Sequence, residues 1–191
     1  MRAVARVPPF DRPATYEDLV ELPDNLIAEI VAGELHASPR PAPRHAVAES
    51  ALGMLLGSPF HFGRGGPGGW WILTEPELHL AADVLVPDYA GWRRTRLPSM
   101  PEKAYFELAP DWLCEILSPS TVSLDRTRKL AVYAREGVPH VWLVDPLART
   151  LEVLRLESGR WTIVSAHAGG EAVRAEPFGE VELALGDLWV D

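Results

Sequence analysis

The chain has 191 residues, of which 47% are hydrophobic and 24% charged, and a formal net charge of −9. These proportions are typical of soluble globular proteins and exclude disordered and collagen-like chains. An acidic chain is also not a nonspecific nucleic-acid coat protein, whose affinity comes from neutralising phosphates. No apolar run approaches the roughly 18 residues of a membrane span, and the N-terminal sequence has no signal-peptide core. We therefore expect a cytoplasmic protein without membrane contact, folded as a single domain over residues 1–191.

The N-terminal half predicts short helices and strands separated by proline and glycine. Thr15 with Asp18 three residues later is typical of a helix start, and Pro23 ends that helix. Ala32-Gly33 between two apolar segments predicts a β-hairpin. The remaining predicted elements are a helix over 44–56, a flexible glycine-rich loop over 63–69, and strands over 70–80 and 82–88 joined by a short turn. Residues 93–110 are predicted to be irregular.

The C-terminal half predicts a parallel pair of buried strands. The apolar segments 112–117 and 140–145 flank a helix expected from Ser123 to Glu136. Because a strand, a helix and a second strand follow within a short stretch, we expect a parallel crossover connection. The residues after 150 alternate as antiparallel strands do, over 150–156, 160–166 and 180–185. The predicted fold class is α/β, with a mixed β-sheet.

Two acidic residues interrupt otherwise apolar strands. Glu115 lies inside Trp-Leu-Cys-Glu-Ile-Leu, and Asp88 ends Val-Leu-Val-Pro-Asp. A buried carboxylate must be paired, protonated or bound to a metal, and two carboxylates from neighbouring strands suit Mg²⁺. The alternative is a buried salt bridge to arginine or lysine. If the two acids share one cation site, they must lie close together, and without metal one of them should have a raised pKa.

A lysine on the following helix can reach the same place. Asp125, Lys129 and Tyr133 are spaced four residues apart and form one stripe of the expected helix. If this stripe faces the sheet, the ammonium of Lys129 can orient or deprotonate a water, or stabilise charge on a phosphate. The alternative is a surface ion pair between Asp125 and Lys129, contributing only about 0.2–0.5 kcal/mol.

These motifs together resemble the bacterial Uma family of restriction-endonuclease-like proteins, within the PD-(D/E)XK superfamily. The resemblance covers about residues 13–146 and rests, in chain order, on AEIVAGEL (28–35), VPD (86–88), WLCEILSPST (112–121), the Asp125–Lys129–Tyr133 stripe and GVPHVWLVDP (137–146). It implies a nuclease core: a mixed β-sheet flanked by helices, with Mg²⁺ or Mn²⁺ at its carboxylates, and with the residues after about 150 as an added antiparallel extension.

The resemblance also implies roles for individual residues. Asp88 matches the motif's aspartate and Glu115 its second acid, and the Ile116 carbonyl completes the expected metal ligands. The superfamily lysine normally stands two residues after the second acid, where this chain has Leu117, so Lys129 is the matching residue. The expected accessory residues are Glu29, Asp125, Tyr133 and His45. For His45, a solvent-facing or core-satisfied histidine is the alternative.

Two function hypotheses follow. The first is a metal-dependent endonuclease-like phosphodiesterase acting on DNA, as a homodimer, because cutting two strands usually takes two sites. The apolar strands after residue 150, with Trp161 and Trp189, offer contact surface for such a dimer. The second is a catalytically inactive regulatory or interaction domain with the same fold, favoured by the acidic charge and by Leu117. The candidates for DNA contact, expected to flank the metal site, are Arg93, Arg94, Arg96 and Lys103.

Overall fold

A mixed six-stranded sheet forms the centre of the computed structural model, which describes residues 5–6, 11–23 and 25–190. Its strand order is β11-β10-β9-β8-β7-β4. The strands of this sheet are β4 (Trp70–Thr74), β7 (Tyr89–Arg93), β8 (Trp112–Ile116), β9 (His140–Asp145), β10 (Thr150–Glu157) and β11 (Arg160–Ala168). Strands β8 and β9 are parallel and the other neighbours are antiparallel, so the predicted crossover and mixed sheet are confirmed.

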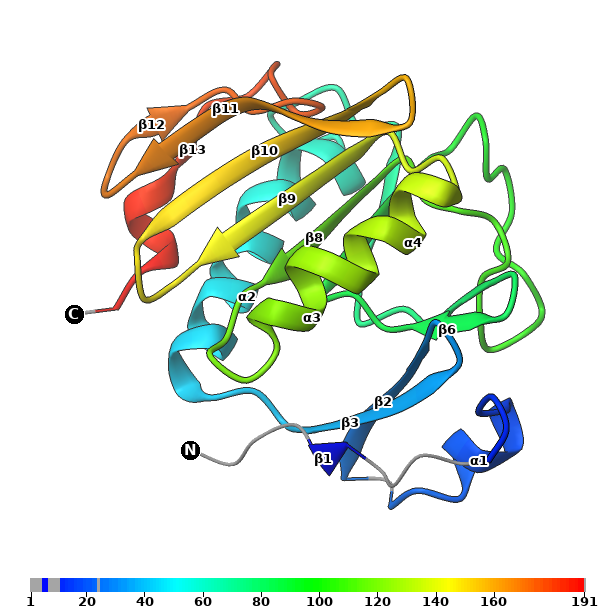
Figure 1. The fold of residues 1–191 in the computed structure, drawn as a ribbon. Coiled ribbons are helices and arrows are strands. Elements are labelled where there is room, and N and C mark those ends of the chain that lie inside the picture. The colour runs from blue at the N-terminus through cyan, green and yellow to red at the C-terminus, as the bar shows by residue number, and fades with distance from the viewer. Residues whose placement is uncertain (1–4, 7–10, 24, 191) are drawn as a thin grey trace.

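Helices cover both faces of this sheet (Figure 1). The helical segments are α1 (Tyr16–Val20), α2 (Pro43–Leu56) continued by a π-helical turn at Gly57–His61, α3 (Val122–Leu124), a second π-helical turn at Asp125–Lys129, α4 (Leu130–Arg135) and a 3₁₀ turn at Leu185–Leu188. In Figure 1, α2 lies behind the sheet, and α3 and α4 cross in front of it. None of the helices in the described part of the chain is both long and apolar enough to cross a bilayer.

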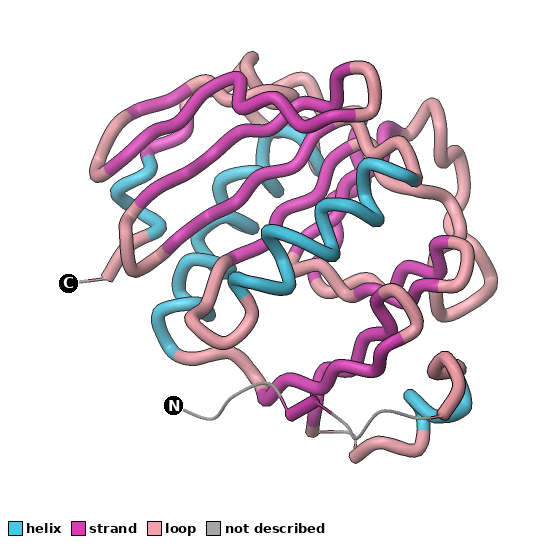
Figure 2. The backbone as a smooth tube through the Cα atoms, viewed as in Figure 1, coloured by secondary structure: helices cyan, strands magenta, loops and turns pink. Residues whose placement is uncertain are grey.

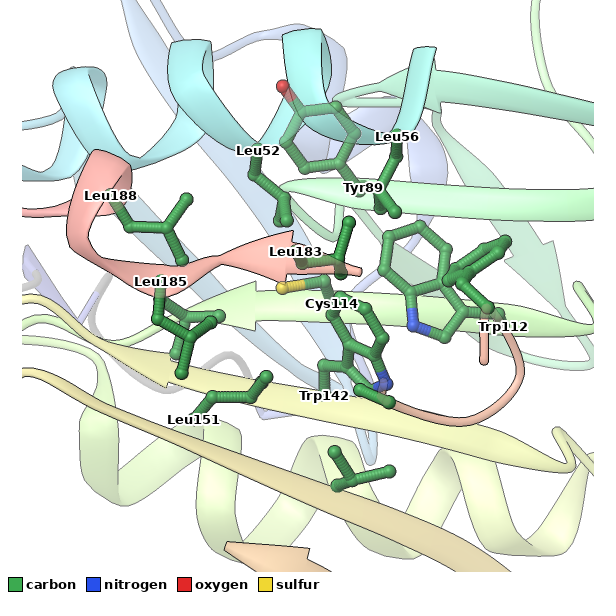
Figure 3. Close-up of a cluster of buried hydrophobic side chains, with 14 of the residues drawn as sticks. Leu52, Leu56, Tyr89, Trp112, Cys114, Trp142, Leu151, Leu183, Leu185 and Leu188 are labelled. Carbon is green, nitrogen blue, oxygen red and sulfur yellow. The ribbon is translucent and has the colours of Figure 1, made fainter. Parts of the chain in front are cut away.

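Strand β8 divides its side chains between the two faces, because successive residues of a strand point to opposite sides. Trp112, Cys114 and Ile116 belong to the core on the α2 side, which also takes in the C-terminal segment (Figure 3). Leu113 belongs to the core on the α4 side. Glu115 therefore points from the central strand toward α4.

A second sheet, which the sequence did not predict, lies beside the first (Figure 2). Its order is β1-β3-β2-β6-β5, and its strands are β1 (Ala5–Arg6), β2 (Leu26–Val31), β3 (Glu34–Pro39), β5 (Leu78–Leu80) and β6 (Asp83–Leu85). The single strand expected over 70–80 was wrong: Glu75 has a φ of +44°, and Pro76 follows it. The chain bends there, so that β4 joins the large sheet and β5 the second one.

Three ion pairs join the second sheet to the helical segment that follows β8. Each has a basic residue on that segment and an acidic residue on the second sheet. The pairs are Lys129–Glu29 at 2.9 Å, Arg128–Glu34 at 2.7 Å and Arg135–Asp83 at 2.7 Å. The second sheet is thus held against one particular helix face.

The predicted helix start at Thr15 and the predicted hairpin at Ala32-Gly33 are confirmed. Asp18 accepts a hydrogen bond from the Thr15 backbone N–H at 2.8 Å, as expected for a capped helix start. Ala32 and Gly33 both have positive φ, which a tight hairpin turn between β2 and β3 requires. The last predicted strand, over 180–185, was largely wrong: only β13 (Leu183–Ala184) pairs there, with β12 (Ala172–Val173), and a 3₁₀ turn follows.

The two tryptophans expected at the dimer surface are used within the chain. The indole of Trp161 donates to the Leu130 carbonyl at 2.8 Å, and that of Trp189 donates to the Gly169 carbonyl at 2.6 Å. Both rings are partly buried against the cores of the two sheet faces. These tryptophans therefore fasten the C-terminal extension to the core and do not supply a free contact surface.

Candidate active site

Lys129 and Glu115 meet in the interior, between the large sheet and α4. The Lys129 ammonium lies 2.9 Å from Glu115 Oε1 and 3.5 Å from Asp125 Oδ1. The side chains of all three residues are no more than 4% exposed. The surface ion pair between Asp125 and Lys129, considered as an alternative, is therefore wrong: both residues face inward.

The helix carrying these residues is not regular. We expected one α-helix over 123–136, but Asp125–Lys129 forms a π-helical turn between α3 and α4. Such wider turns occur frequently at functional sites. Here the turn buries Asp125 and Lys129 at its two ends, while Arg126, Thr127 and Arg128 between them stay exposed.

Tyr133 and Glu29 complete the surroundings of Lys129. The Tyr133 hydroxyl donates to Glu115 Oε1 at 2.6 Å. Glu29, on β2 of the second sheet, lies 2.9 Å from the ammonium through Oε1, which also accepts the Val86 backbone N–H at 2.8 Å. The Lys129 ammonium thus has three acidic neighbours, Glu115, Asp125 and Glu29. The buried salt bridge that was the alternative to a metal site is therefore present.

Asp88 lies in the connection between β6 and β7, and not at the end of a strand as predicted. Its Oδ2 accepts the backbone N–H of Ile116 at 2.6 Å, which ties Asp88 to the residue after Glu115. Its Oδ1 lies 3.0 Å from Nε2 of His45, in the first turn of α2. The solvent-facing alternative for His45 is wrong, because the ring is mostly buried; its Nε2 is paired with Asp88, whereas its Nδ1 has no hydrogen-bond partner among the described residues.

All of these acidic residues border one cavity of about 280 Å³. The predicted site residues that line it are Glu29, His45, Asp88, Glu115, Ile116, Asp125 and Lys129. Asp88 and Glu115 thus line a common cavity, and Tyr133 contacts Glu115; that the two carboxylates share one cation stays a prediction.

Part of the cavity wall escaped the sequence analysis. Arg40 and the hydroxyl residues Ser118, Ser120 and Thr121 also line the space. These three hydroxyl residues belong to the Ser-Pro-Ser-Thr string, residues 118–121, which is part of the family resemblance. Its polar side chains, directly after a buried strand, were the signal for a wall of hydrogen-bonding groups.

Burial and neighbouring charges shift the pKa values of three groups that line the cavity. Burial raises the pKa of Glu115 well above its usual value; the Lys129 ammonium offsets this in part, while nearby carboxylates, among them Asp88, add to it. Burial likewise raises the pKa of Asp125 to about 6. For Lys129, burial lowers the pKa, but the charges of Glu115 and Glu29 outweigh it, so its pKa lies well above the usual value. The expected rise for one acid is present, with burial as the main cause.

The four basic residues proposed for DNA contact do not flank this cavity. Asp88 precedes β7, whereas Arg93, Arg94, Arg96 and Lys103 lie at or after its far end and are not among the lining residues. Three of them have partners within the chain. These are Trp70 and His61 carbonyls for Arg94, Asp111 for Arg96 and Glu107 for Lys103. The guanidinium of Arg93 lies 4.5 Å over the Trp70 ring.

Comparison with known proteins bears on this geometry. The model of the Uma2 family, described as "Putative restriction endonuclease", matches residues 13–186. The chain belongs to the Uma2 family. The family match extends past the predicted limit near residue 146, so it includes most of the C-terminal strands.

A solved structure shares this Uma2 fold. It is described as a putative nuclease belonging to DUF820 from Anabaena variabilis ATCC 29413, and it matches with a TM-score of 0.73 and 23% sequence identity. The match covers 92% of this chain and 97% of that one. The expected nuclease-like fold class is therefore confirmed. No curated protein matches the sequence.

Proposed function

We propose that this Uma2 protein is a metal-dependent nuclease that hydrolyses phosphodiester bonds of DNA at the cavity between its two sheets. The observation that carries the proposal is the convergence of Asp88, Glu115 and Lys129 on one cavity. Two carboxylates and a lysine are the groups that metal-assisted phosphodiester hydrolysis uses. The family description and the fold agree with this reading.

The donor set fits Mg²⁺ or Mn²⁺. Among the described residues, Tyr133 and Lys129 both contact Oε1 of Glu115, which leaves Oε2 for a ligand. Within residues 5–6, 11–23 and 25–190, no three His, Cys, Asp or Glu side chains form a preassembled metal cluster. Mg²⁺ does not need one, since it is usually held by one or two carboxylates with waters and substrate phosphates. Asp88, Glu115 and the Ile116 carbonyl would hold the ion.

The chain's own groups then have separate roles. When bound, the metal supplies an activated water and a positive charge at the phosphate. Because the pKa of Lys129 is raised, its side chain stays protonated at neutral pH and acts as a charged donor rather than as a base. Its ammonium can hydrogen-bond to a phosphate oxygen or hold the attacking water. Glu29 pairs with this ammonium, and Tyr133 donates to the Glu115 carboxylate beside it.

The functional test is cleavage of single-stranded and duplex DNA by the full chain with Mn²⁺, Mg²⁺ or EDTA. We expect metal-dependent cleavage that Asp88→Asn and Glu115→Gln each abolish. Glu182→Gln is the control, because it removes an exposed carboxylate elsewhere on the surface. A folded protein that neither binds these ions nor cuts DNA would instead support the inactive regulatory or interaction domain.

A homodimer and a DNA-contacting basic surface belong to the same proposal. With Trp161 and Trp189 used inside the chain, the dimer rests on the need of a duplex-cutting enzyme for two sites. Sedimentation at micromolar concentration tests the dimer: a result of monomer only would contradict it.

Neutralising Arg93, Arg94, Arg96 and Lys103 together should flatten the salt dependence of DNA binding. An unchanged dependence would show that this surface does not contact DNA.

A further inference from the structure

The Asp88 carboxylate is held on both of its oxygens. The Ile116 backbone N–H binds Oδ2 at 2.6 Å, and His45 Nε2 lies 3.0 Å from Oδ1. Asp88 itself lies in the connection between β6 and β7, where its backbone carbonyl accepts the Glu75 N–H at 3.0 Å, and among the described residues its carboxylate has no further contact. Its side-chain direction therefore depends on these two donors.

Apart from its contact with Asp88, His45 has no side-chain hydrogen bond to the described part of the chain. Its Nδ1 is fully buried without a hydrogen-bond partner, and Glu49 Oε2 lies 3.9 Å from it, beyond hydrogen-bond distance. Only 11% of the His45 side chain is exposed. A buried polar ring with an unsatisfied nitrogen lowers stability relative to an apolar residue. The contact with Asp88 is therefore the feature that explains a histidine at this position.

The element that carries His45 is held against the sheet. The Tyr89 hydroxyl, on the residue next to Asp88, donates to the Glu49 carbonyl of α2. At Gly53 a Cβ atom would lie 2.5 Å from that same hydroxyl, so glycine permits the close approach. His45 therefore reaches Asp88 from a helix that is anchored to Tyr89, the residue next to Asp88.

We infer that His45 is a positioning residue that orients the Asp88 carboxylate for the divalent cation, without itself being a ligand. This inference rests on the proposed function, because it assigns a role at the same site. His45 Nε2 contacts Asp88 Oδ1, and carboxylates that bind a metal are usually held by such a hydrogen-bonding neighbour. Loss of such a partner typically weakens metal affinity by about 10–100-fold.

The test is Mn²⁺ affinity of the full chain, measured by titration calorimetry, in a set of His45 variants. His45→Ala and His45→Asn should bind Mn²⁺ about 10–100-fold more weakly than the unaltered protein. His45→Gln should recover most of the affinity, because its amide nitrogen lies near the place of Nε2, whereas that of asparagine lies near Nδ1. Melting temperatures identify any variant that fails to fold.

His167 supplies the matched control. It too has one carboxylate contact, to Glu171 at 3.4 Å, and one buried nitrogen without a partner, but it lies on β11 and does not line the cavity. His167→Ala should leave Mn²⁺ affinity unchanged. Equal affinities of the unaltered protein and His45→Ala, or of the glutamine and asparagine variants, would overturn the positioning role alone. Absence of Mn²⁺ binding by the unaltered protein would overturn the metal site and this role together.

Discussion

The Lys129 ammonium lies 2.9 Å from Glu115 Oε1 and 2.9 Å from Glu29 Oε1, so a single cation bridges the central strand of the large sheet and the second sheet. Lys129 is also the residue that the sequence predicted as a catalytic group. The same side chain therefore has a structural role, and the effects of its replacement must be separated by measuring stability as well as activity.

Replacing Lys129 with alanine should destabilise the protein strongly. The change leaves the buried carboxylates of Glu115 and Glu29 without their cation, and breaking a buried ion pair costs about 3–5 kcal/mol. The loss should be largest at neutral pH and smaller at pH 4, because burial raises the pKa of Glu115 and its carboxyl group is protonated in acid. Urea unfolding at both pH values measures it. A loss below about 0.5 kcal/mol is what an exposed pair would give, and it would contradict the buried bridge.

Lys129→Arg tests the active-site role with the charge kept. We expect this variant to lose most of its metal-dependent DNA cleavage, because a planar guanidinium does not reproduce a compact ammonium in this confined position. The measurement is cleavage rate beside a melting temperature. A folded Lys129→Arg protein as active as the unaltered one would remove Lys129 from the proposed mechanism and leave Asp88 and Glu115 in it.

Asp125 predicts a specific pH dependence of stability. Burial raises its pKa to about 6 from an ordinary value of 3.8, so between these values the folded state binds more protons than the unfolded one. The contribution of this group to stability is therefore greatest near pH 4 and falls as pH rises through 6. Asp125→Asn removes the titration, so its stability relative to the unaltered protein should rise by on the order of 2–3 kcal/mol from pH 4 to pH 7. An unchanged difference across this range would contradict the assignment.

Cys114 should be chemically silent in the folded protein. The side chain is fully buried on β8, and burial raises the pKa of its thiol well above the usual value. The thiolate is the reactive form, so a thiol reagent such as DTNB should label Cys114 only at the rate of unfolding. Labelling rates with and without urea provide the check. Rapid labelling in native buffer would show that the core around Trp112 and Trp142 opens.

The sequence predicted those features that depend on local pattern. The buried strands β8 and β9, the hairpin at Ala32-Gly33 and the stripe of Asp125, Lys129 and Tyr133 all follow from short-range periodicity and turn chemistry. Because Glu115 interrupts an apolar strand, its burial beside a cation was also predictable from the cost of an unpaired buried charge.

The features that depend on distant contacts were not predictable. The bend at Glu75 sends β4 and β5 into different sheets, and no local signal shows which sheet each strand joins. Contact between Glu29 and Lys129 spans 100 positions and exists only once the second sheet packs on α4. The positions of the basic residues at and after the end of β7 were wrong for the same reason. They are close to Asp88 in sequence, but strand β7 separates them from it in space.

The proposed function depends on Asp88 and Glu115 holding one divalent cation in the cavity between the sheets. Crystals of the full chain soaked in Mn²⁺ test this most directly, through the anomalous scattering of manganese. We predict one strong anomalous peak within coordination distance, about 2.0–2.6 Å, of both carboxylates, absent in Asp88→Asn crystals soaked in the same way. A well-ordered soaked crystal with no manganese in this cavity, or with manganese bound only elsewhere, would contradict the account.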